Sequence, residues 1–171
     1  METSEPTNLE ITLRPATVDD ALTILAITRA AFEQFLDRLD PPSGALKETL
    51  ETLVGSAFQP DHGVTLAFVD GKPAGALRWS IHPQRAHLYV GRVAVPPPYR
   101  RQGIASALMH WADDHARILG LPAVQFGVRL QAPENIRFYQ RLGYQIIEYA
   151  QHAGYDHPTF VWMRKDLQSS S

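Results

Sequence analysis

The order of apolar and polar residues predicts strands and helices along the whole chain. Residues 9–14 alternate with a period of two, which is typical of a half-buried strand. A helical spacing follows Thr17, which can cap a helix, and continues to Phe35. Further helices are predicted over 45–54, 104–119 and 133–142, and further strands over 64–69, 74–81, 86–95, 123–128, 144–150 and 159–164. This order indicates a mixed α/β sheet with at least one strand–helix–strand crossover.

The fourth predicted strand changes the phase of its apolar side within one run. Leu88 and Val90 are apolar at even positions, whereas Val93 and Val95 are apolar at odd ones. An inserted residue is needed to keep one face buried across such a change. We therefore predict a β-bulge at Gly91 and Arg92, which bends the strand and disturbs its pairing with a neighbour. The alternative is a central strand with both faces covered and no bulge.

The loop after this strand carries the most informative chemistry. Residues 100–106 join the strand to a helix that begins at or just before Ile104. The start of a helix has unpaired N–H groups and the positive end of the dipole, so it attracts anions. Gly103 lets the backbone approach a ligand, and Arg100 and Arg101 add positive charge. These residues alone suit either a phosphate site or an ordinary solvated loop. The nucleotide P-loop and dinucleotide glycine patterns are absent, so a phosphate site here would leave room for another phosphate-bearing cofactor.

Two motifs give the chain a family resemblance. Arg100-Arg-Gln-Gly-Ile-Ala105 fits the (Gln/Arg)-x-x-Gly-x-(Gly/Ala) loop of the GNAT family of N-acetyltransferases, and residues 92–95 look like that family's fourth strand. Downstream, residues 134–144 are similar to the family's Asn…Tyr…Gly-Phe/Tyr helix. The resemblance implies one N-acetyltransferase domain over 9–167. It also implies a mixed, mainly antiparallel sheet of about seven strands with flanking helices, in which the bulged fourth strand is splayed from the fifth. In the family, the pantetheine arm of coenzyme A lies in that gap.

By this resemblance, three groups of residues would contact acetyl-CoA. Main-chain groups at the end of the fourth strand would pair with the pantetheine amides, and an N–H at the bulge would polarise the thioester. The backbone of the following loop would hold the pyrophosphate. Asn135 and Tyr139 would lie near the pantetheine and the sulfur, with Tyr139 as the general acid that protonates the leaving thiolate. The cofactor contacts implied are Val93, Ala94, Val95, Arg100, Arg101, Gln102, Gly103, Ile104, Ala105, Ser106 and Asn135.

The predicted helix over 133–142 leaves two alternatives open. Many family members have an asparagine seven residues before the tyrosine, where this chain has Ala132, and Asn135 lies only four residues before Tyr139. At that spacing the two side chains share a helix face, so both could reach the cofactor. Asn135 could instead serve the start of the helix, and Tyr139 could be a core aromatic with a solvated tip.

The residue that deprotonates the acceptor amine is poorly marked. The family uses a carboxylate, a histidine or an ordered water near the fourth and fifth strands. A structural role suits each candidate at least as well. The candidates are His87, Tyr89, His82, Glu33 and, as a water positioner, Gln125.

Composition and charge indicate the class of protein and its compartment, but not its reaction. The 171 residues are 44% hydrophobic and 20% charged, which suits one globular domain. A net charge of −2 gives no attraction to nucleic acid or anionic membranes. The chain lacks cysteine, a signal-like start and a membrane-length apolar run, so we expect a cytoplasmic protein. His62, His152 and His157 have no partner at metal-ligand spacing and suit solvated loops, so no metal is expected. The polar ends, 1–8 and 168–171, are expected to fray.

The sequence therefore predicts an enzyme that transfers an acetyl group from acetyl-CoA to a primary amine of a small molecule, by direct attack in a ternary complex. Residues 17–55 and the loop over 152–158 would form the acceptor side. The alternatives are a protein or peptide amine acetyltransferase and an acyl-CoA-binding module without transfer activity. The acceptor, the base, the acyl-chain preference and the oligomeric state, including a homodimer, stay open.

Overall fold

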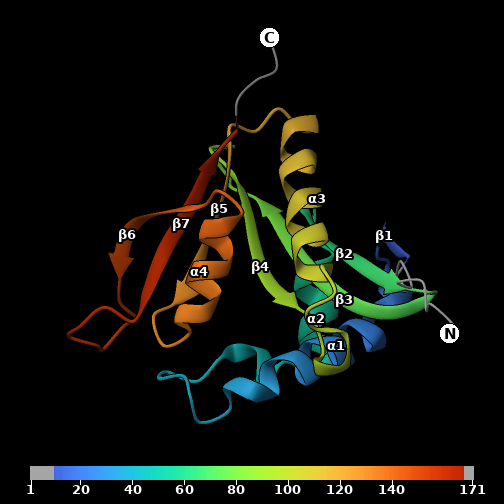
Figure 1. Ribbon diagram of the computed structural model, residues 1–171, viewed down its shortest axis with the longest axis horizontal. Helices are drawn as coiled ribbons and strands as arrows, with labels where there is room; N and C mark the ends of the chain where they lie inside the picture. The colour runs from blue at the N-terminus through green and yellow to red at the C-terminus, as the bar shows by residue number, and fades with distance from the viewer. Residues whose placement is uncertain (1–9, 168–171) are drawn as a thin grey trace, which may run out of the picture.

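The computed structural model describes residues 10–167, which form a seven-stranded sheet with helices on both faces (Figure 1). The strands are β1 (Ile11–Pro15), β2 (His62–Val69), β3 (Lys72–Ile81), β4 (Leu88–Ala94), β5 (Ala123–Arg129), β6 (Gln145–Ala150) and β7 (Phe160–Asp166). The helices are α1 (Ala21–Phe32), α2 (Leu50–Ala57), α3 (Ile104–Ile118) and α4 (Pro133–Arg141). The strand order is β1-β2-β3-β4-β5-β7-β6, and only β4 and β5 pair in parallel. The predicted mixed, mainly antiparallel sheet is confirmed, and the terminal segments expected to fray lie outside the described residues.

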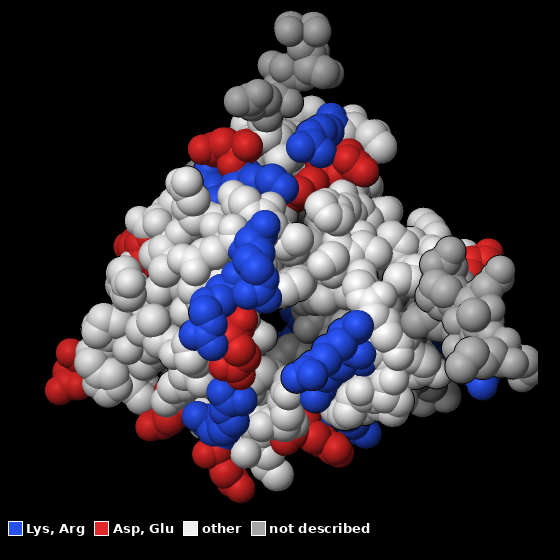
Figure 2. Space-filling model, viewed as in Figure 1, with Lys and Arg blue, Asp and Glu red and all other residues white. Residues whose placement is uncertain are grey.

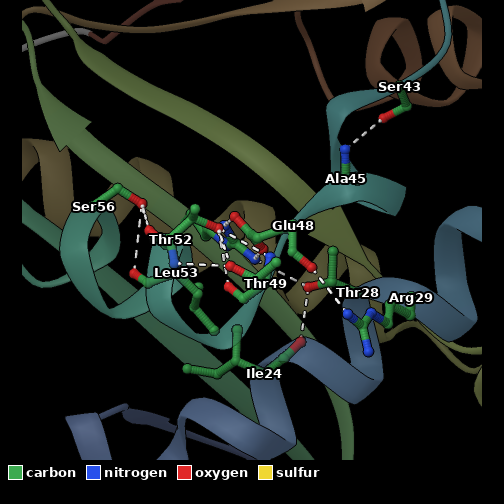
Figure 3. A network of polar contacts seen from close by, with 11 residues as sticks. Ile24, Thr28, Arg29, Ser43, Ala45, Glu48, Thr49, Thr52, Leu53 and Ser56 are labelled. Carbon is green, nitrogen blue, oxygen red and sulfur yellow. Dashed lines mark hydrogen bonds and ion pairs between the residues drawn. The ribbon is translucent and has the colours of Figure 1, made fainter.

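The first two helices differ in extent from the prediction. α1 ends at Phe32, and a 3-10 turn (Glu33–Phe35) continues it to the expected end. The helix predicted over 45–54 is instead a 3-10 turn (Gly44–Lys47) followed by α2. The backbone is extended at Glu48, between them, and Thr49 then caps α2 by accepting a hydrogen bond from the Thr52 N–H at 3.2 Å (Figure 3).

The sheet separates two apolar clusters. α1 and α2 cover one face, where Ile24, Leu53 and Leu66 are fully buried. α3 covers the other face, where Leu77 and Leu108 are fully buried. Because both faces are covered, the sheet positions α1 and α3 on opposite sides of β4.

β4 contains the predicted bulge. Opposite β3, Ala76 pairs with Ala94 and Arg78 pairs with Gly91, so β4 has one more residue than β3 over this stretch. Arg92 lies at the extra position, with a φ of +48°, in the left-handed region. The apolar residues on either side of the bulge contact the same apolar cluster under α3, which explains the phase change; they are Leu88, Val90, Val93 and Val95.

β4 also leaves β5 where the bulge begins. The two strands pair only at Leu88 with Val124 and at Tyr89 with Gln125. Figure 1 shows them diverging beyond this point. The predicted splaying of the fourth strand from the fifth is therefore confirmed.

A buried carboxylate connects the elements on the α3 side of the sheet. Asp113 of α3 accepts hydrogen bonds from the Tyr144 hydroxyl at 2.5 Å and from the Lys165 ammonium at 2.6 Å. Lys165 also donates to the Leu142 carbonyl at 2.9 Å, just after α4. Burial, together with the bond to Asp113, raises the pKa of Tyr144 far above the ordinary phenol value, so it remains a donor. This network fixes α3, the end of α4 and β7 relative to one another.

Replacing Lys165 by Met should destabilise the protein strongly. The Asp113 carboxylate is only 4% exposed, and removing the cation beside it leaves a buried charge without compensation, at a cost of about 3 kcal/mol. Urea unfolding of Lys165→Met measures this loss. Arg117→Met is the matched control, because its ion pair with Asp114 on the same helix is exposed and contributes little. Equal losses in the two variants would contradict the role given to the buried network.

Candidate active site

A cleft of about 900 Å³ opens where β4 leaves β5. The two strands line it together with the start of α3, one face of α4 and the chain that follows α1. His152 of the loop between β6 and β7, together with Phe160 and Trp162 of β7, also borders it. Figure 2 shows a hollow on this face of the molecule with basic side chains on both of its sides. Segments from nearly the whole described chain therefore border this one cleft.

The loop before α3 presents a row of backbone N–H groups. Arg101 and Gly103 both have left-handed backbones, with φ of +63° and +83°, and the first intrahelical bond runs from the Ala107 N–H to the Gly103 carbonyl. Within residues 10–167, no group accepts a hydrogen bond from the N–H groups of residues 101–106. The loop and the first helical turn are thus built to receive an anion.

The two arginines of this loop have different roles. The Arg100 guanidinium donates to the Val95 carbonyl at 3.2 Å and to the Ala31 carbonyl at 3.1 Å. Arg100 therefore fastens the loop to β4 and α1, although it also lines the cleft. Arg101 is exposed at the cleft, and no hydrogen bond to another described residue holds its side chain. Its positive charge is available to a ligand.

Two of the residues expected at the cofactor do not line the cleft. Ala94 is fully buried in the cluster under α1 and α2, because the bulge turns its side chain to the opposite face from Val93 and Val95. The Gln102 amide donates to the Pro98 carbonyl at 3.3 Å. The other expected contacts border the cleft: Val93, Val95, Arg100, Arg101, Gly103, Ile104, Ala105, Ser106 and Asn135.

α4 brings Tyr139 and Asn135 to the same cleft. The Tyr139 ring packs against Phe126 of β5, with 4.5 Å between centroids, and burial raises its pKa well above the ordinary phenol value. Among residues 10–167, no group is hydrogen-bonded to its hydroxyl. Ala132, not Asn135, precedes the first helical residue, and no side chain caps that end of the helix. Tyr139 is thus a protonated phenol that faces the cleft.

Most of the candidates for the base lie elsewhere. The His82 and His87 rings are 4.6 Å apart outside the cleft, and burial is the main cause that lowers the pKa of His87. The Gln125 amide accepts a hydrogen bond from Arg164 at 3.1 Å, and Glu33 is not part of the cleft wall either. Tyr89 is the member of this set that borders the cleft.

His152 was missed by the sequence analysis, which expected a solvated loop position. It is half-buried at the cleft wall, with its ring 5.0 Å from that of Phe160 and its Nδ1 hydrogen-bonded to the Thr159 hydroxyl. Burial first, and the charge of Arg129 second, lower its pKa below the ordinary histidine value. The lowered pKa favours the neutral form of the imidazole at the cleft wall. Its contacts form only in the folded chain, so the loop sequence gave no signal of them.

Two cleft arginines were also missed as site residues. Arg92 was noted only as part of the bulge, and Arg129 lies at the end of β5. The Arg129 guanidinium donates to the Pro41 carbonyl at 2.7 Å. An arginine next to a predicted phase change is the one signal in the sequence that could have pointed to Arg92.

Among residues 10–167, no group of three or more His, Asp or Glu side chains could hold a metal ion. No helix within the same residues is long and apolar enough to cross a membrane.

Comparison with known proteins identifies the family. A sequence model of the acetyltransferase (GNAT) family matches residues 25–144, so the chain belongs to this family. The protein is an acyl-CoA-dependent N-acyltransferase, and the family resemblance seen in the sequence is confirmed. The aminoalkylphosphonate N-acetyltransferase of Salmonella typhimurium is 28% identical to it over 138 residues, which cover 78% of this chain and 84% of that enzyme.

Solved structures share the fold. The ribosomal-protein-S18-alanine N-acetyltransferase of Escherichia coli superposes with a TM-score of 0.75 at 18% identity, covering 95% of this chain and 97% of that one. The PaiA N-acetyltransferase of Thermoplasma acidophilum, in complex with coenzyme A, superposes with a TM-score of 0.74 at 18% identity, covering 92% and 99%. At these identities the likeness shows the GNAT fold.

Proposed function

We propose that this protein transfers an acetyl group from acetyl-CoA to the primary amine of a small molecule, by direct attack in a ternary complex. The observation that carries the proposal is the cleft between β4 and β5. It holds a row of unpaired N–H groups at one end and a phenol hydroxyl without a hydrogen-bond partner among residues 10–167 beside it.

The cofactor half of the cleft fits the parts of acetyl-CoA. The N–H groups of residues 101–106, the positive end of α3 and the charge of Arg101 would hold the pyrophosphate. Beyond Tyr89, the main chain of β4 has lost its pairing with β5, so its peptide groups could pair with the pantetheine amides as an added strand would. The side chains of Val93 and Val95 provide an apolar wall along this path.

Tyr139 is the residue proposed to return a proton to the leaving sulfur. Acetyl-CoA supplies the thioester whose acetyl group the amine takes. Because the pKa of Tyr139 is raised by burial, its hydroxyl keeps the proton until a strong base forms nearby. A thiolate released in the same desolvated surroundings is such a base, since burial disfavours its charged form as well. The Tyr139 hydroxyl is then both the proton donor and a hydrogen-bond donor to the developing charge.

The acceptor side favours a small molecule over a protein chain. The segment after α1 is fastened across this side of the cleft, since Arg38 donates to the Gln131 carbonyl at 3.0 Å and to Glu134 at 2.8 Å. Arg129 donates to Pro41 of the same segment, and the Tyr155 hydroxyl donates to Asp40. This segment borders the cleft at Leu39 and Ser43, where it would restrict the entry of a peptide strand. The similarity to an aminoalkylphosphonate N-acetyltransferase also supports a small amine.

The function is tested by thiol release from acetyl-CoA over a panel of small amines, amino acids and peptides. We expect release with at least one small amine, and double-reciprocal plots for the two substrates that intersect, as a ternary complex requires. Faster release with peptides than with every small amine would favour the protein acetyltransferase instead. Binding of acetyl-CoA without release across the whole panel would identify a silent binding module.

Reversing the charge of Arg101 should weaken acetyl-CoA binding by at least about tenfold, or about 1.4 kcal/mol. The reason is that Arg101→Glu places a negative charge beside the proposed pyrophosphate site. Titration calorimetry measures the dissociation constant. Arg117→Glu makes the same charge change in the last turn of α3 and should leave it near the native value. Unchanged affinity in Arg101→Glu would remove the loop from the cofactor site.

Removing the hydroxyl of Tyr139 should lower kcat by about a hundredfold, in the range typical of a lost general acid. The dissociation constant of acetyl-CoA should change little, because the ring that packs on Phe126 is kept in Tyr139→Phe. Tyr149→Phe on β6 is the control, since that side chain is 60% exposed and does not border the cleft. Native turnover in Tyr139→Phe would end its role as the acid.

A further inference from the structure

The bulge residue Arg92 brings a positive charge to the cleft wall without a paired acid. Its side chain is half-buried and borders the cleft, and its left-handed backbone places it at the point where β4 bends. Within residues 10–167, no hydrogen bond or ion pair engages its guanidinium. Burial is the main cause that lowers its pKa, although an arginine stays charged at neutral pH.

Glu48, the carboxylate whose charge acts on Arg92, is already paired with another arginine. Glu48 accepts two hydrogen bonds from the Arg78 guanidinium, at 2.5 Å and 2.6 Å, and both side chains are largely buried. Arg78 also donates to the Thr28 hydroxyl at 3.3 Å, and Figure 3 shows Thr28 and Glu48 side by side in this network. Tyr89 is also close enough to Arg92 to influence its pKa. Because Glu48 is paired with Arg78, Arg92 keeps a surplus positive charge.

A second arginine stands near this charge. Arg129 also borders the cleft, and one of its nitrogens donates to the Pro41 carbonyl. The pKa of Arg129 is lowered chiefly by burial, and the charge of Arg92 lowers it further. Asp40 and Tyr155 are the groups that oppose this effect, and Asp40 already accepts the Tyr155 hydroxyl. Both guanidinium groups thus belong to residues that border the same cleft, and within residues 10–167 no hydrogen bond engages that of Arg92.

We propose that Arg92 and Arg129 bind an oxyanion carried by the acceptor, so that the substrates are short amines bearing a phosphonate, phosphate, carboxylate or sulfonate group. The inference rests on the proposed function, because it concerns the acceptor half of the same cleft. Guanidinium groups present paired N–H donors that match two oxygens of such a group. A partly desolvated cation without a partner gains more from an incoming anion than a fully hydrated one would.

The position of Arg92 also limits the length of the acceptor. Arg92 is followed directly by Val93, whose main chain is proposed to lie along the pantetheine arm. The anion held by Arg92 would therefore lie close to the reacting thioester. A short spacer between the amine and the oxyanion suits this arrangement.

The first test compares amines that differ only in the anion. 2-Aminoethylphosphonate, β-alanine, taurine and ethanolamine share a two-carbon spacer and carry a phosphonate, a carboxylate, a sulfonate and no anion. We expect kcat/KM for at least one anionic amine to exceed that for ethanolamine by at least about tenfold. In Arg92→Met this ratio should fall at least about tenfold, mainly through KM. Arg14→Met removes a positive charge at β1, outside the cleft wall, and should keep the native ratio.

The second test measures the anion site without catalysis. Methylphosphonate, propionate and ethanesulfonate are added separately to the native protein, and the thermal unfolding midpoint is recorded. We expect at least one of them to raise the midpoint, and the rise to be lost in Arg92→Met. Without any anion, Arg92→Met should be at least as stable as the native protein, because it removes an unpaired half-buried charge. A purely structural Arg92 would instead make the variant less stable.

The two tests separate failure of this inference from failure of the proposed function. Equal use of ethanolamine and the anionic amines would overturn the oxyanion site, while acetyl transfer itself would stand. Stabilisation by an anion that depends on Arg92, with no thiol release from any amine, would support the oxyanion site and overturn the transfer activity. The anion that gives the largest effect identifies which oxyanion the acceptor carries.

Discussion

One inserted residue in β4 determines the shape of the functional half of this molecule. A regular strand would continue its parallel ladder with β5, and the space between the two would be filled by their own hydrogen bonds. The bulge ends that ladder at Tyr89 and Gln125. It keeps Val93 and Val95 on the same face as Leu88 and Val90, so the apolar cluster under α3 stays continuous along β4. Beyond Tyr89, the peptide groups of β4 therefore do not pair with β5 and could pair with a ligand. They lie at the centre of the sheet and not at its edge.

In the proposed function, the two ends of the cleft would recognise charge by different means. At the α3 end the positive potential comes mainly from backbone N–H groups, which are fixed in place by the helix and by the Arg100 bonds to Ala31 and Val95. A common ligand part can be held this way, since main-chain groups are insensitive to side-chain substitution. At the acceptor end the positive charge comes from the side chains of Arg92 and Arg129. Side chains change readily by mutation, so this is the end where specificity can vary while the rest of the fold is retained.

The sequence contained the local features of this arrangement but not the long-range ones. The phase change around Gly91 was visible because strand periodicity is a property of neighbouring residues, and the loop at Gly103 was visible for the same reason. His152 and Arg129 could not be assigned, because their surroundings come from Thr159, Phe160 and Pro41, which fold against them from elsewhere in the chain. The histidines beside the fourth strand were reasonable candidates for a base. They lie near the end of β4 that stays paired with β5, whereas the cleft opens at the other end.

The left-handed backbone at Arg92 links the conformation of the strand to the identity of the side chain there. Glycine, asparagine and aspartate tolerate a φ of +48° best, and a β-branched residue tolerates it poorly. Homologues that keep the bulge are therefore not expected to carry valine, isoleucine or threonine at this position, whereas glycine, asparagine or aspartate would keep the bulge and remove the positive charge. Loss of the cation at the acceptor end would then require no change in the course of β4.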